Sequence, residues 1–282
     1  RGAHRADAGP LSGGACLACM AGPEHDAFAG FERLLISDVD GTLLADGRTD
    51  GRCGELAARL RVARAELVLA TGRDLTLTLE ASALLSRAGL PRPAALICSV
   101  GSEIYLGPGL EPDRDWTRHI AVDWDREAVG TVLAAVPGLV LQDESGQGPF
   151  KVSYVFEGER PDAWRLVTSN AGRALEAAGL SARRIASAGR FLDVVPSRVS
   201  KGAAALWLME RAGIDPTHVV VAGDSGNDRE MLTAVHGSGP LRAVIVGDHD
   251  LELADLAGRR HVHVAEQATC AGVVEGLIAH GW

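Results

Sequence analysis

The apolar residues of the chain form short runs that are separated by longer stretches with a helical period. The runs "RLLI" (residues 33–36) and "ELVLA" (66–70) have the length of buried strands. The stretch "CGELAARLRVARA" (53–65) lies between them and has the apolar spacing of an amphipathic helix. Strands that alternate with helices in this way predict a parallel sheet with helices on both faces, which is a doubly wound α/β fold.

The alternation continues along most of the chain, but it changes near residue 112. In the α/β part, further strands are expected within 94–106, 218–228, 241–247 and 261–265, and further helices within 76–90, 201–214, 229–235 and 270–281. In the part that starts near residue 112, helices are expected at 125–138 and 161–179, and strands within 139–142, 150–156 and 183–196. We therefore predict a core formed by residues 31–111 and 198–282, with an inserted α+β domain at 112–197.

The first 30 residues are rich in Gly and Ala and have no clear period, so we interpret residues 1–30 as a disordered linker or tail. Cys16 and Cys19 form a C-x-x-C there, which fits either half of a zinc site or a redox pair. No second C-x-x-C follows, and we favour two incidental cysteines. The odd total of five cysteines indicates reduced thiols and a cytoplasmic location.

The composition excludes some functions and leaves others open. The 282 residues are 46% hydrophobic and 23% charged, which is an ordinary globular balance. The net charge of −9 argues against a nucleic-acid partner, and no apolar run approaches the roughly 20 residues that span a membrane. A small phosphorylated substrate stays compatible with the charge, because a metal ion and a few basic groups can reverse the local field.

Polar side chains follow three of the predicted core strands. Asp38 and Asp40 come after "RLLIS", Thr71 follows "ELVLA", and Asp224 and Asp228 come after "VVVAG". Residues two apart on a strand face the same side, and the carboxyl ends of parallel strands share one edge of a sheet. These side chains can therefore converge on one crevice, where Mg²⁺ with its preference for oxygen ligands would relieve the repulsion between carboxylates.

Each motif has a structural alternative when it is taken alone. "DVD" can cap a turn, "ATGR" is a common type of strand end, and "GDSGND" can be an ordinary turn. Lys201 opens a predicted helix, where a cation opposes the helix dipole, although such a lysine is often simply solvated. The four features in this order resemble the haloacid dehalogenase (HAD) superfamily of aspartate-nucleophile phosphohydrolases, from about residue 31 to the end of the chain.

The resemblance implies a role for each motif residue. Asp38 would be the nucleophile that forms an aspartyl-phosphate, and Asp40 would be the general acid and base. Thr71 and Lys201 would hold the phosphoryl oxygens. The substrate-binding positions of the second motif are Thr71, Gly72 and Arg73. The metal site would consist of Asp38, the backbone carbonyl of Asp40, Asp224, Asn227 and Asp228.

Longer stretches resemble the sucrose-phosphate phosphatase branch of this superfamily, which includes the phosphatase-like carboxyl-terminal domain of bacterial sucrose-phosphate synthases. These stretches are "SVGSEIYLGPGLEPD", "GPFKVSYVF", "LDVVPSRVSKGAAALWL" and "TCAGVVEGL". The resemblance implies a Rossmann-like HAD core with a C2-type cap at 112–197. Cap residues of this branch bind glucosyl hydroxyls, and the matching positions are Gln147, Lys151 and Ser153, followed by Gln142 and Glu144.

Two points qualify the sugar site. Without the family match, Lys151 also fits a surface lysine on a strand. The branch usually has a Glu before the position of Gln147, whereas this chain has Gly146. A pocket that lacks this carboxylate should discriminate less well between sugars, because hydrogen bonds to hydroxyls carry much of the specificity.

The predicted function is a Mg²⁺-dependent phosphatase that hydrolyses a disaccharide phosphate, with sucrose 6-phosphate as the first candidate. Mannosylfructose phosphate and glucosylglycerol phosphate are alternative substrates. A non-catalytic phosphatase-like domain of a sucrose-phosphate synthase is an alternative of another class, motivated by the non-Met start and the linker-like first residues. In that case the chain would be fused to, or associated with, a glycosyltransferase.

Overall fold

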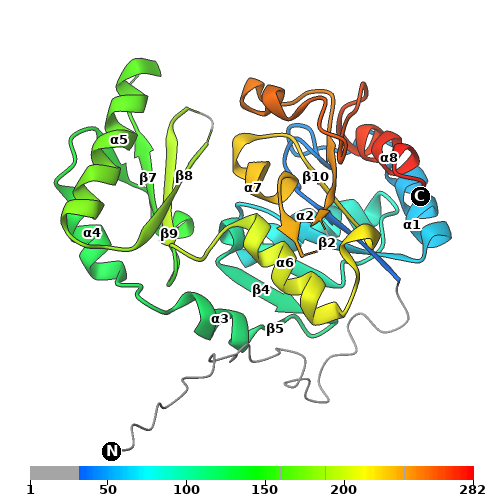
Figure 1. Ribbon diagram of the computed structural model, residues 1–282, viewed down its shortest axis with the longest axis horizontal. Helices are drawn as coiled ribbons and strands as arrows, with labels where there is room; N and C mark the ends of the chain where they lie inside the picture. Colours follow the sequence, from blue (N-terminus) through cyan, green and yellow to red (C-terminus); the bar gives the residue numbers. More distant parts are fainter. Residues whose placement is uncertain (1–31, 159–160, 188, 238) are drawn as a thin grey trace, which may run out of the picture.

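The computed structural model describes residues 32–158, 161–187, 189–237 and 239–282. Its larger part is built on an eight-stranded sheet with the order β14-β13-β10-β1-β2-β3-β4-β5 (Figure 1). Within these ranges the parallel strands are β1 (Arg33–Ser37), β2 (Ala65–Ala70), β3 (Ala95–Cys98), β10 (Val219–Gly223), β13 (Arg242–Ile245) and β14 (Val262–Val264). β4 (Glu103–Leu106) and β5 (Glu111–Pro112) extend the sheet in the antiparallel direction. The expected α/β class is confirmed. The predicted linker, with Cys16 and Cys19, lies outside the described residues.

Helices cover both faces of this sheet, because its strands are apolar on both sides. On one face lie α1 (Cys53–Ala63), α2 (Leu75–Arg87) and α8 (Thr269–Ala279). On the other face lie α6 (Lys201–Ala212) and the short α7 (Arg229–Leu232). Within β1, Leu34 and Ile36 pack on the α6 face and Leu35 on the α1 face, and all three are fully buried. A continuous apolar run of this kind is what a strand covered on both sides requires.

A second, antiparallel sheet lies beside the first and has the order β6-β7-β9-β8. Its strands are β6 (Leu139–Leu141), β7 (Val152–Phe156), β8 (Ala182–Ser187) and β9 (Phe191–Pro196). The helices α4 (Arg126–Ala134) and α5 (Pro161–Ala177) cover one face of this sheet and bury Val152, Tyr154, Leu192 and Val194. Figure 1 shows this group, in green, as a lobe beside the larger sheet. We call it the cap lobe.

The connection into the cap lobe contains a helix that the periodicity does not predict, α3 (Arg114–Ile120). Its Trp116 and Ile120 are buried in the cluster under α6, so α3 packs with the larger sheet although it lies within residues 112–197. The Trp116 and Trp207 rings lie 5.4 Å apart. The returning segment contacts the same helix, because Arg198 donates a hydrogen bond of 3.1 Å to the carbonyl of His119. The two segments that connect the larger lobe to the cap lobe are therefore linked to each other by this hydrogen bond.

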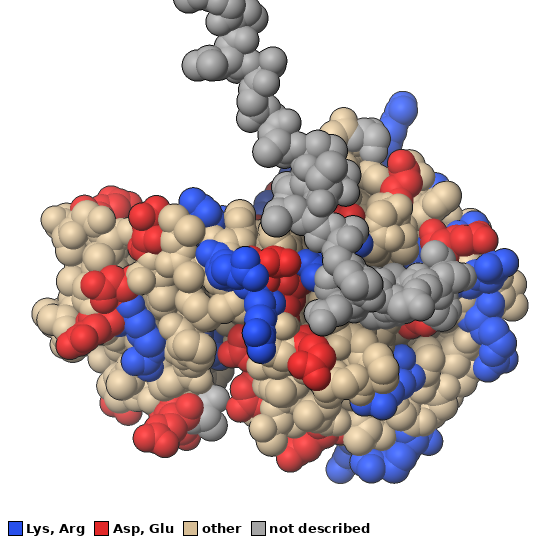
Figure 2. Space-filling view, turned by 90° about the horizontal axis from the view of Figure 1, so that it is seen from below, with Lys and Arg blue, Asp and Glu red and all other residues tan. Residues whose placement is uncertain are grey.

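Two small features complete the described part. The hairpin of β11 (Val235–His236) and β12 (Gly239–Pro240) follows α7 and, like β5, was not predicted from the sequence. None of the helices in the described ranges is long and apolar enough to cross a membrane. On the face that Figure 2 shows, acidic and basic side chains are interspersed over both lobes.

Candidate active site

The three predicted strand ends meet at one edge of the larger sheet. Asp38 follows β1, Thr71 follows β2 and Asp224 follows β10, and β1 is the strand that pairs with both of the others. The Asp38 amide donates to the carbonyl of Ala222 (2.9 Å), which holds the end of β1 against β10. All three residues line one cleft, together with Asp40, as the alternation of side chains predicted.

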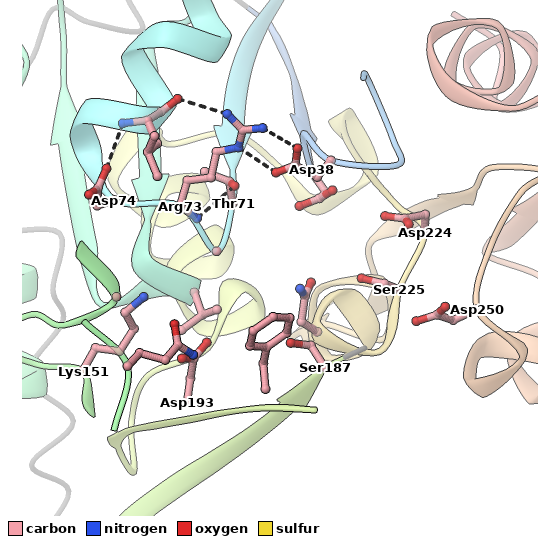
Figure 3. A pocket seen from close by; sticks show the side chains of 18 residues that line it. Asp38, Thr71, Arg73, Asp74, Lys151, Ser187, Asp193, Asp224, Ser225 and Asp250 are labelled. Carbon is pink, nitrogen blue, oxygen red and sulfur yellow. Dashed lines mark hydrogen bonds and ion pairs between the residues drawn. The ribbon is translucent and has the colours of Figure 1, made fainter. Parts of the chain in front are cut away.

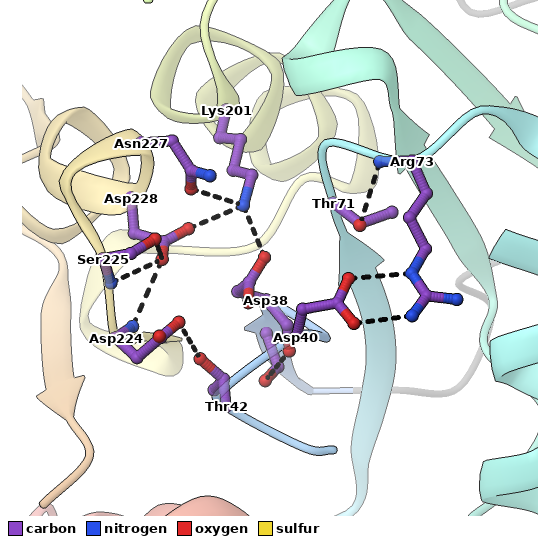
Figure 4. Close-up of polar contacts among 11 residues, drawn as sticks. Asp38, Asp40, Thr42, Thr71, Arg73, Lys201, Asp224, Ser225, Asn227 and Asp228 are labelled. Carbon is purple, nitrogen blue, oxygen red and sulfur yellow. Dashed lines mark hydrogen bonds and ion pairs between the residues drawn. The ribbon is translucent and has the colours of Figure 1, made fainter. Parts of the chain in front are cut away.

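Lys201 lies at the centre of a buried polar network (Figure 4). Its Nζ donates to Asp38 Oδ1 (2.5 Å), Asn227 Oδ1 (2.9 Å) and Asp228 Oδ1 (2.7 Å), and the residue is 1% exposed. Burial alone would lower the pKa of Lys201, but the carboxylates of Asp228 and Asp38 outweigh it and raise the pKa. The lysine is therefore charged, and it is not the solvated residue that the sequence also allowed.

Asp228 organises the loop after β10 as well as binding the lysine. Its Oδ2 accepts hydrogen bonds from the amides of Asp224 and Ser225, each at 3.2 Å. The other oxygen is bound to Lys201, so both oxygens of this buried carboxylate have partners. These contacts leave the Asp224 side chain directed toward Asp38, where it accepts a hydrogen bond from Thr42 Oγ1 (3.1 Å).

Carboxylate oxygens of Asp38, Asp224 and Asp228 lie within 4.8 Å of one another. Burial and the charge of Asp228 raise the pKa of Asp224 to about 7. Burial, again with Asp228, raises the pKa of Asp38 well above its usual value, although Lys201 opposes this. The raised pKa values mean that these carboxyls ionise less readily when no cation is present. A group of closely spaced carboxylate oxygens is the type of site that Mg²⁺ prefers. Both carboxylate oxygens of Asp228 and the amide oxygen of Asn227 are already bound, whereas only Oδ1 of Asp38 is bound to Lys201. Asp38 and Asp224 are therefore the side chains that could contact a Mg²⁺ ion directly.

Gly41 is required by the close packing of this site. It has φ +86°, and a Cβ atom there would lie 2.1 Å from Asp224 Oδ2. No other residue fits between the loop after β1 and the acidic side chain without displacing one of them. The Gly of the D-x-D-G-T motif thus lets the loop pass over the carboxylate that would hold a metal.

Asp40 lies at the open side of the site and binds Arg73. The guanidinium donates to both carboxylate oxygens, from Nε at 2.7 Å and from NH2 at 2.6 Å. The hydrogen bonds to Asp40 are the main cause that raises the pKa of Arg73. Both side chains are partly exposed, so solvent screens this pair more than the Lys201 network. The sequence analysis predicts Arg73 as a substrate-binding residue, and it does not predict the contact with Asp40.

The cleft has a volume of about 590 Å³ and is bounded by both lobes. Figure 3 shows Asp38, Thr71 and Arg73 on one side of it, and Lys151 and Asp193 on the facing side. Gly72 also lines it, as expected. The structure therefore brings Asp38, Thr71 and Arg73 to the same cavity as two of the predicted sugar-side residues, Lys151 and Gln142.

The other predicted sugar-binding residues differ in their placement. Gln142 lines the cleft, whereas Gln147, Ser153 and the exposed Glu144 are not part of its wall. The Gln147 amide is occupied by the backbone: Oε1 accepts from the amide of Ser153 (3.0 Å), and Nε2 donates to the Ser153 carbonyl (2.9 Å). Nε2 also donates to the Gln142 carbonyl (3.1 Å), so both amide hydrogens of Gln147 hold the loop before β7.

Sequence reasoning missed three residues of the cap lobe that line the cleft, Ser187 of β8 and Phe191 and Asp193 of β9. A signal for Phe191 and Asp193 was present in "FLDVVP", where the apolar Leu192 and Val194 alternate with them. Alternation of period two places Phe191 and Asp193 on the face opposite to the core of the cap lobe.

Comparisons with known proteins give relatives that share these features. A family model described as sucrose-6F-phosphate phosphohydrolase matches residues 31–281. Mannosylfructose-phosphate phosphatase of Agrobacterium fabrum is 33% identical over 87% of this chain and 95% of that protein. Sucrose-phosphatase 1 of Nicotiana tabacum is 35% identical over 59% of this chain and 39% of that protein. The chain spans about half, or less, of the plant relatives that it matches.

Solved structures give the same grouping. The sucrose-phosphatase from Synechocystis sp. PCC6803, in complex with sucrose and phosphate, has a TM-score of 0.75 at 28% identity, covering 89% of this chain and 98% of that chain. A sugar phosphatase of HAD subclass IIB has a TM-score of 0.64 at 14% identity, over 88% of this chain and 99% of that chain, which shows a shared fold. The predicted superfamily and its Rossmann-like core are confirmed.

Proposed function

The chain belongs to the sucrose-6F-phosphate phosphohydrolase family, and from this premise we propose that it hydrolyses a disaccharide phosphate, with sucrose 6-phosphate as the first candidate. Membership makes it a phosphoric monoester hydrolase that acts on sugar phosphates. The observation that carries the proposal is Asp38, a buried carboxylate bound to Lys201 at the floor of a cleft that both lobes enclose. Such a group is shielded from water and directed at an incoming phosphorus atom.

We propose the following roles for the side chains. Asp38 attacks phosphorus and forms an aspartyl-phosphate, while Asp40 protonates the leaving sugar oxygen and then accepts a proton from the attacking water. Lys201 and Thr71 bind phosphoryl oxygens, and the lysine charge offsets the negative charge that gathers beside the nucleophile. Mg²⁺ held by Asp38, Asp224 and the backbone carbonyl of Asp40 would supply charge neutralisation at the phosphoryl group.

We also propose that residues 112–197 act mainly as the specificity cap. The support is the cleft itself, whose walls are the strand ends of the larger sheet on one side and β9 with the loop before β7 on the other. A sugar attached to a phosphate at Asp38 would extend toward the cap wall. Closure of such a wall would exclude water and select the leaving group.

The decisive experiment is phosphate release by the purified chain, with and without Mg²⁺, and by the Asp38→Asn variant. We expect the variant to lose activity by a factor on the order of 10³ or more, because Asn cannot form the acyl-phosphate. Asp46→Asn is the matched control: Asp46 is exposed, and its φ of 49° is a conformation that Asn tolerates. Undiminished turnover by Asp38→Asn would contradict the mechanism.

A second candidate substrate, mannosylfructose phosphate, is favoured by the relative that the chain covers almost completely. The values of kcat/KM for sucrose 6-phosphate, mannosylfructose phosphate and glucosylglycerol phosphate would rank the three. Phosphate release by this chain alone would also exclude the non-catalytic alternative. Detection of no release from any of them, with Mg²⁺ present, would instead support a binding domain associated with a glycosyltransferase.

A further inference from the structure

The side of the cleft that the cap lobe forms, which we call the cap wall, contains Lys151, Phe191 and Asp193. The sheet behind it has one face in the core of the cap lobe and the other toward the cleft. In β7 and β9 the residues Val152, Tyr154, Leu192 and Val194 point into the core of the cap lobe. Ser153 pairs with Asp193 in the sheet, so both lie on the opposite face, which is the face that the cleft exposes. Phe191 lies two residues before Asp193 and therefore shares this face.

Asp193 is held in place from one side only. Its Oδ1 accepts a hydrogen bond of 2.5 Å from Ser153 Oγ, and among the described residues no hydrogen bond or ion pair to the other oxygen, Oδ2, is found. Ser153 is fully buried, so it works as a fixed support behind the carboxylate. Burial raises the pKa of Asp193, and the charge of Lys151 opposes this shift. A donor from the cleft would satisfy the free oxygen and favour the ionised form.

Lys151 is the complementary group on the same wall. It is only 6% exposed, it lines the cleft, and no hydrogen bond of its Nζ is found in the described part of the chain. Lys151 and Asp193 lie near each other in Figure 3, yet they form no direct ion pair. A hydroxyl group both donates and accepts, so neighbouring hydroxyls of a sugar can satisfy a carboxylate and an ammonium at once.

Phe191 adds an apolar surface beside these two charges. It is a large aromatic residue that is 37% exposed and lines the cleft. The guanidinium of Arg190 lies 5.2 Å from the centre of its ring, a cation–π contact that restrains the ring. An exposed aromatic ring next to hydrogen-bonding side chains matches a sugar ring, which has an apolar face of C–H groups and a rim of hydroxyls.

We infer that Asp193 is the specificity-determining carboxylate of the sugar site, reading hydroxyls of the leaving group together with Lys151 while Phe191 stacks on the sugar ring. This deepens the proposed function and rests on it for the direction in which the sugar extends. Asp193 thus gives this side of the cleft a carboxylate although residue 146 is Gly. Ser153 acts as a positioning residue for Asp193.

The test compares a disaccharide phosphate with p-nitrophenyl phosphate, which has no sugar hydroxyls. In Asp193→Asn, the ratio of kcat/KM for sucrose 6-phosphate to that for p-nitrophenyl phosphate should fall roughly 10- to 100-fold, as expected for loss of a charged hydrogen-bond acceptor. Phe191→Leu should lower the same ratio by about 2- to 10-fold through loss of the ring. The exposed Asp123, changed to Asn, is the matched control and should keep the ratio.

Two outcomes would overturn the inference: an unchanged ratio in Asp193→Asn, or an equal loss on both substrates, which would indicate a structural role. The inference can be separated from the proposed function by NMR saturation-transfer measurements with sucrose plus inorganic phosphate. If the wild-type chain releases no phosphate from any sugar phosphate, the proposed function fails. Sucrose signals that vanish in Asp193→Asn but persist in Asp123→Asn would then still support the sugar site, and absent or unchanged signals would refute it.

Discussion

At the scale of single residues, the two aspartates of the D-x-D motif have opposite surroundings. Asp38 is buried and held by Lys201, whereas Asp40 is half exposed and held by Arg73. In the proposed mechanism the buried group would attack phosphorus and the exposed group would protonate the leaving oxygen. Asp40 would then have to turn from Arg73 toward that oxygen, so we propose that Arg73 is a positioning residue that holds Asp40 beside the cleft until it transfers the proton.

We expect Arg73→Ala to lower turnover of sugar phosphates about 10- to 100-fold, within the usual range of general acid catalysis. The loss should be several times smaller for p-nitrophenyl phosphate, whose leaving group needs little protonation. Arg73→Lys keeps the charge but not the two-point contact, so it should recover only part of the activity. Equal losses on both substrates would show that Arg73 acts on the phosphate instead.

The raised carboxyl pKa values predict how pH affects stability. Without metal, the Asp224 carboxyl binds more protons in the folded than in the unfolded chain between the ordinary aspartate pKa of 3.8 and about 7, its pKa in the folded chain. The contribution of Asp224 to the stability of the metal-free chain should therefore fall as pH rises through this window. Mg²⁺ requires ionised carboxylates, so it should raise the melting temperature more at pH 8 than at pH 5.5.

The measurement is thermal unfolding at both pH values, with and without Mg²⁺, for the wild type and Asp224→Asn. The variant should show a weaker pH dependence and little response to Mg²⁺. Asp215→Asn is a control, because Asp215 is exposed, does not line the cleft, and has a pKa that the hydrogen bonds from Thr217 lower and do not raise. A Mg²⁺ effect of the same size at both pH values would contradict the assignment of the metal site.

At the scale of elements, the position of Lys201 depends on how α6 begins. Ser200 caps the helix by accepting a hydrogen bond from the amide of Ala203 (3.0 Å), so Lys201 takes the first helical position. Gly101, with φ +102°, lets the turn after β3 pack directly on this start, because a Cβ there would lie 2.5 Å from the Ser200 carbonyl oxygen. A cap and a glycine together thus direct Lys201 into the site.

The first residues of α3 also contact a neighbouring helix through their cap. We therefore expect removal of the α3 cap to lower the free energy of unfolding more than removal of the α4 cap. Asp113 caps α3 through two amides and also accepts from the Trp207 indole (3.0 Å), whereas Asp125 caps α4 through one amide at an exposed position. Asp113→Ala should cost roughly 2–4 kcal/mol of unfolding free energy, since it also leaves the indole unpaired. Asp125→Ala should cost about 1 kcal/mol. Urea denaturation of both variants is the check, and equal costs would show that the indole contact is not important.

At the scale of the whole molecule, the apolar pattern of the sequence was sufficient to predict the core strands and the edge of the sheet where the polar residues meet. The apolar runs that became β1, β2 and β10 are buried on both faces, and polar residues after such runs must meet at one sheet edge. α3 escaped prediction because its seven residues are too short for a period and its formation depends on contacts with α6. The pairing of Arg73 with Asp40 and the occupied amide of Gln147 depend on which residues meet across space, which spacing along the chain does not encode.

The contacts that link the two connections between the lobes limit where the cap lobe could be exchanged for that of a relative. α3 lies within the insertion by position, yet Trp116 packs beside Trp207 and the His119 carbonyl binds Arg198. A module that is exchanged between relatives at residue 112 would remove α3 from its neighbours in the larger lobe. A unit of exchange that keeps these contacts would run from the end of α3 to the end of β9. A family that changes sugar preference by swapping modules would place its crossover points there, and Asp193 would travel with the module while Lys201 stays behind.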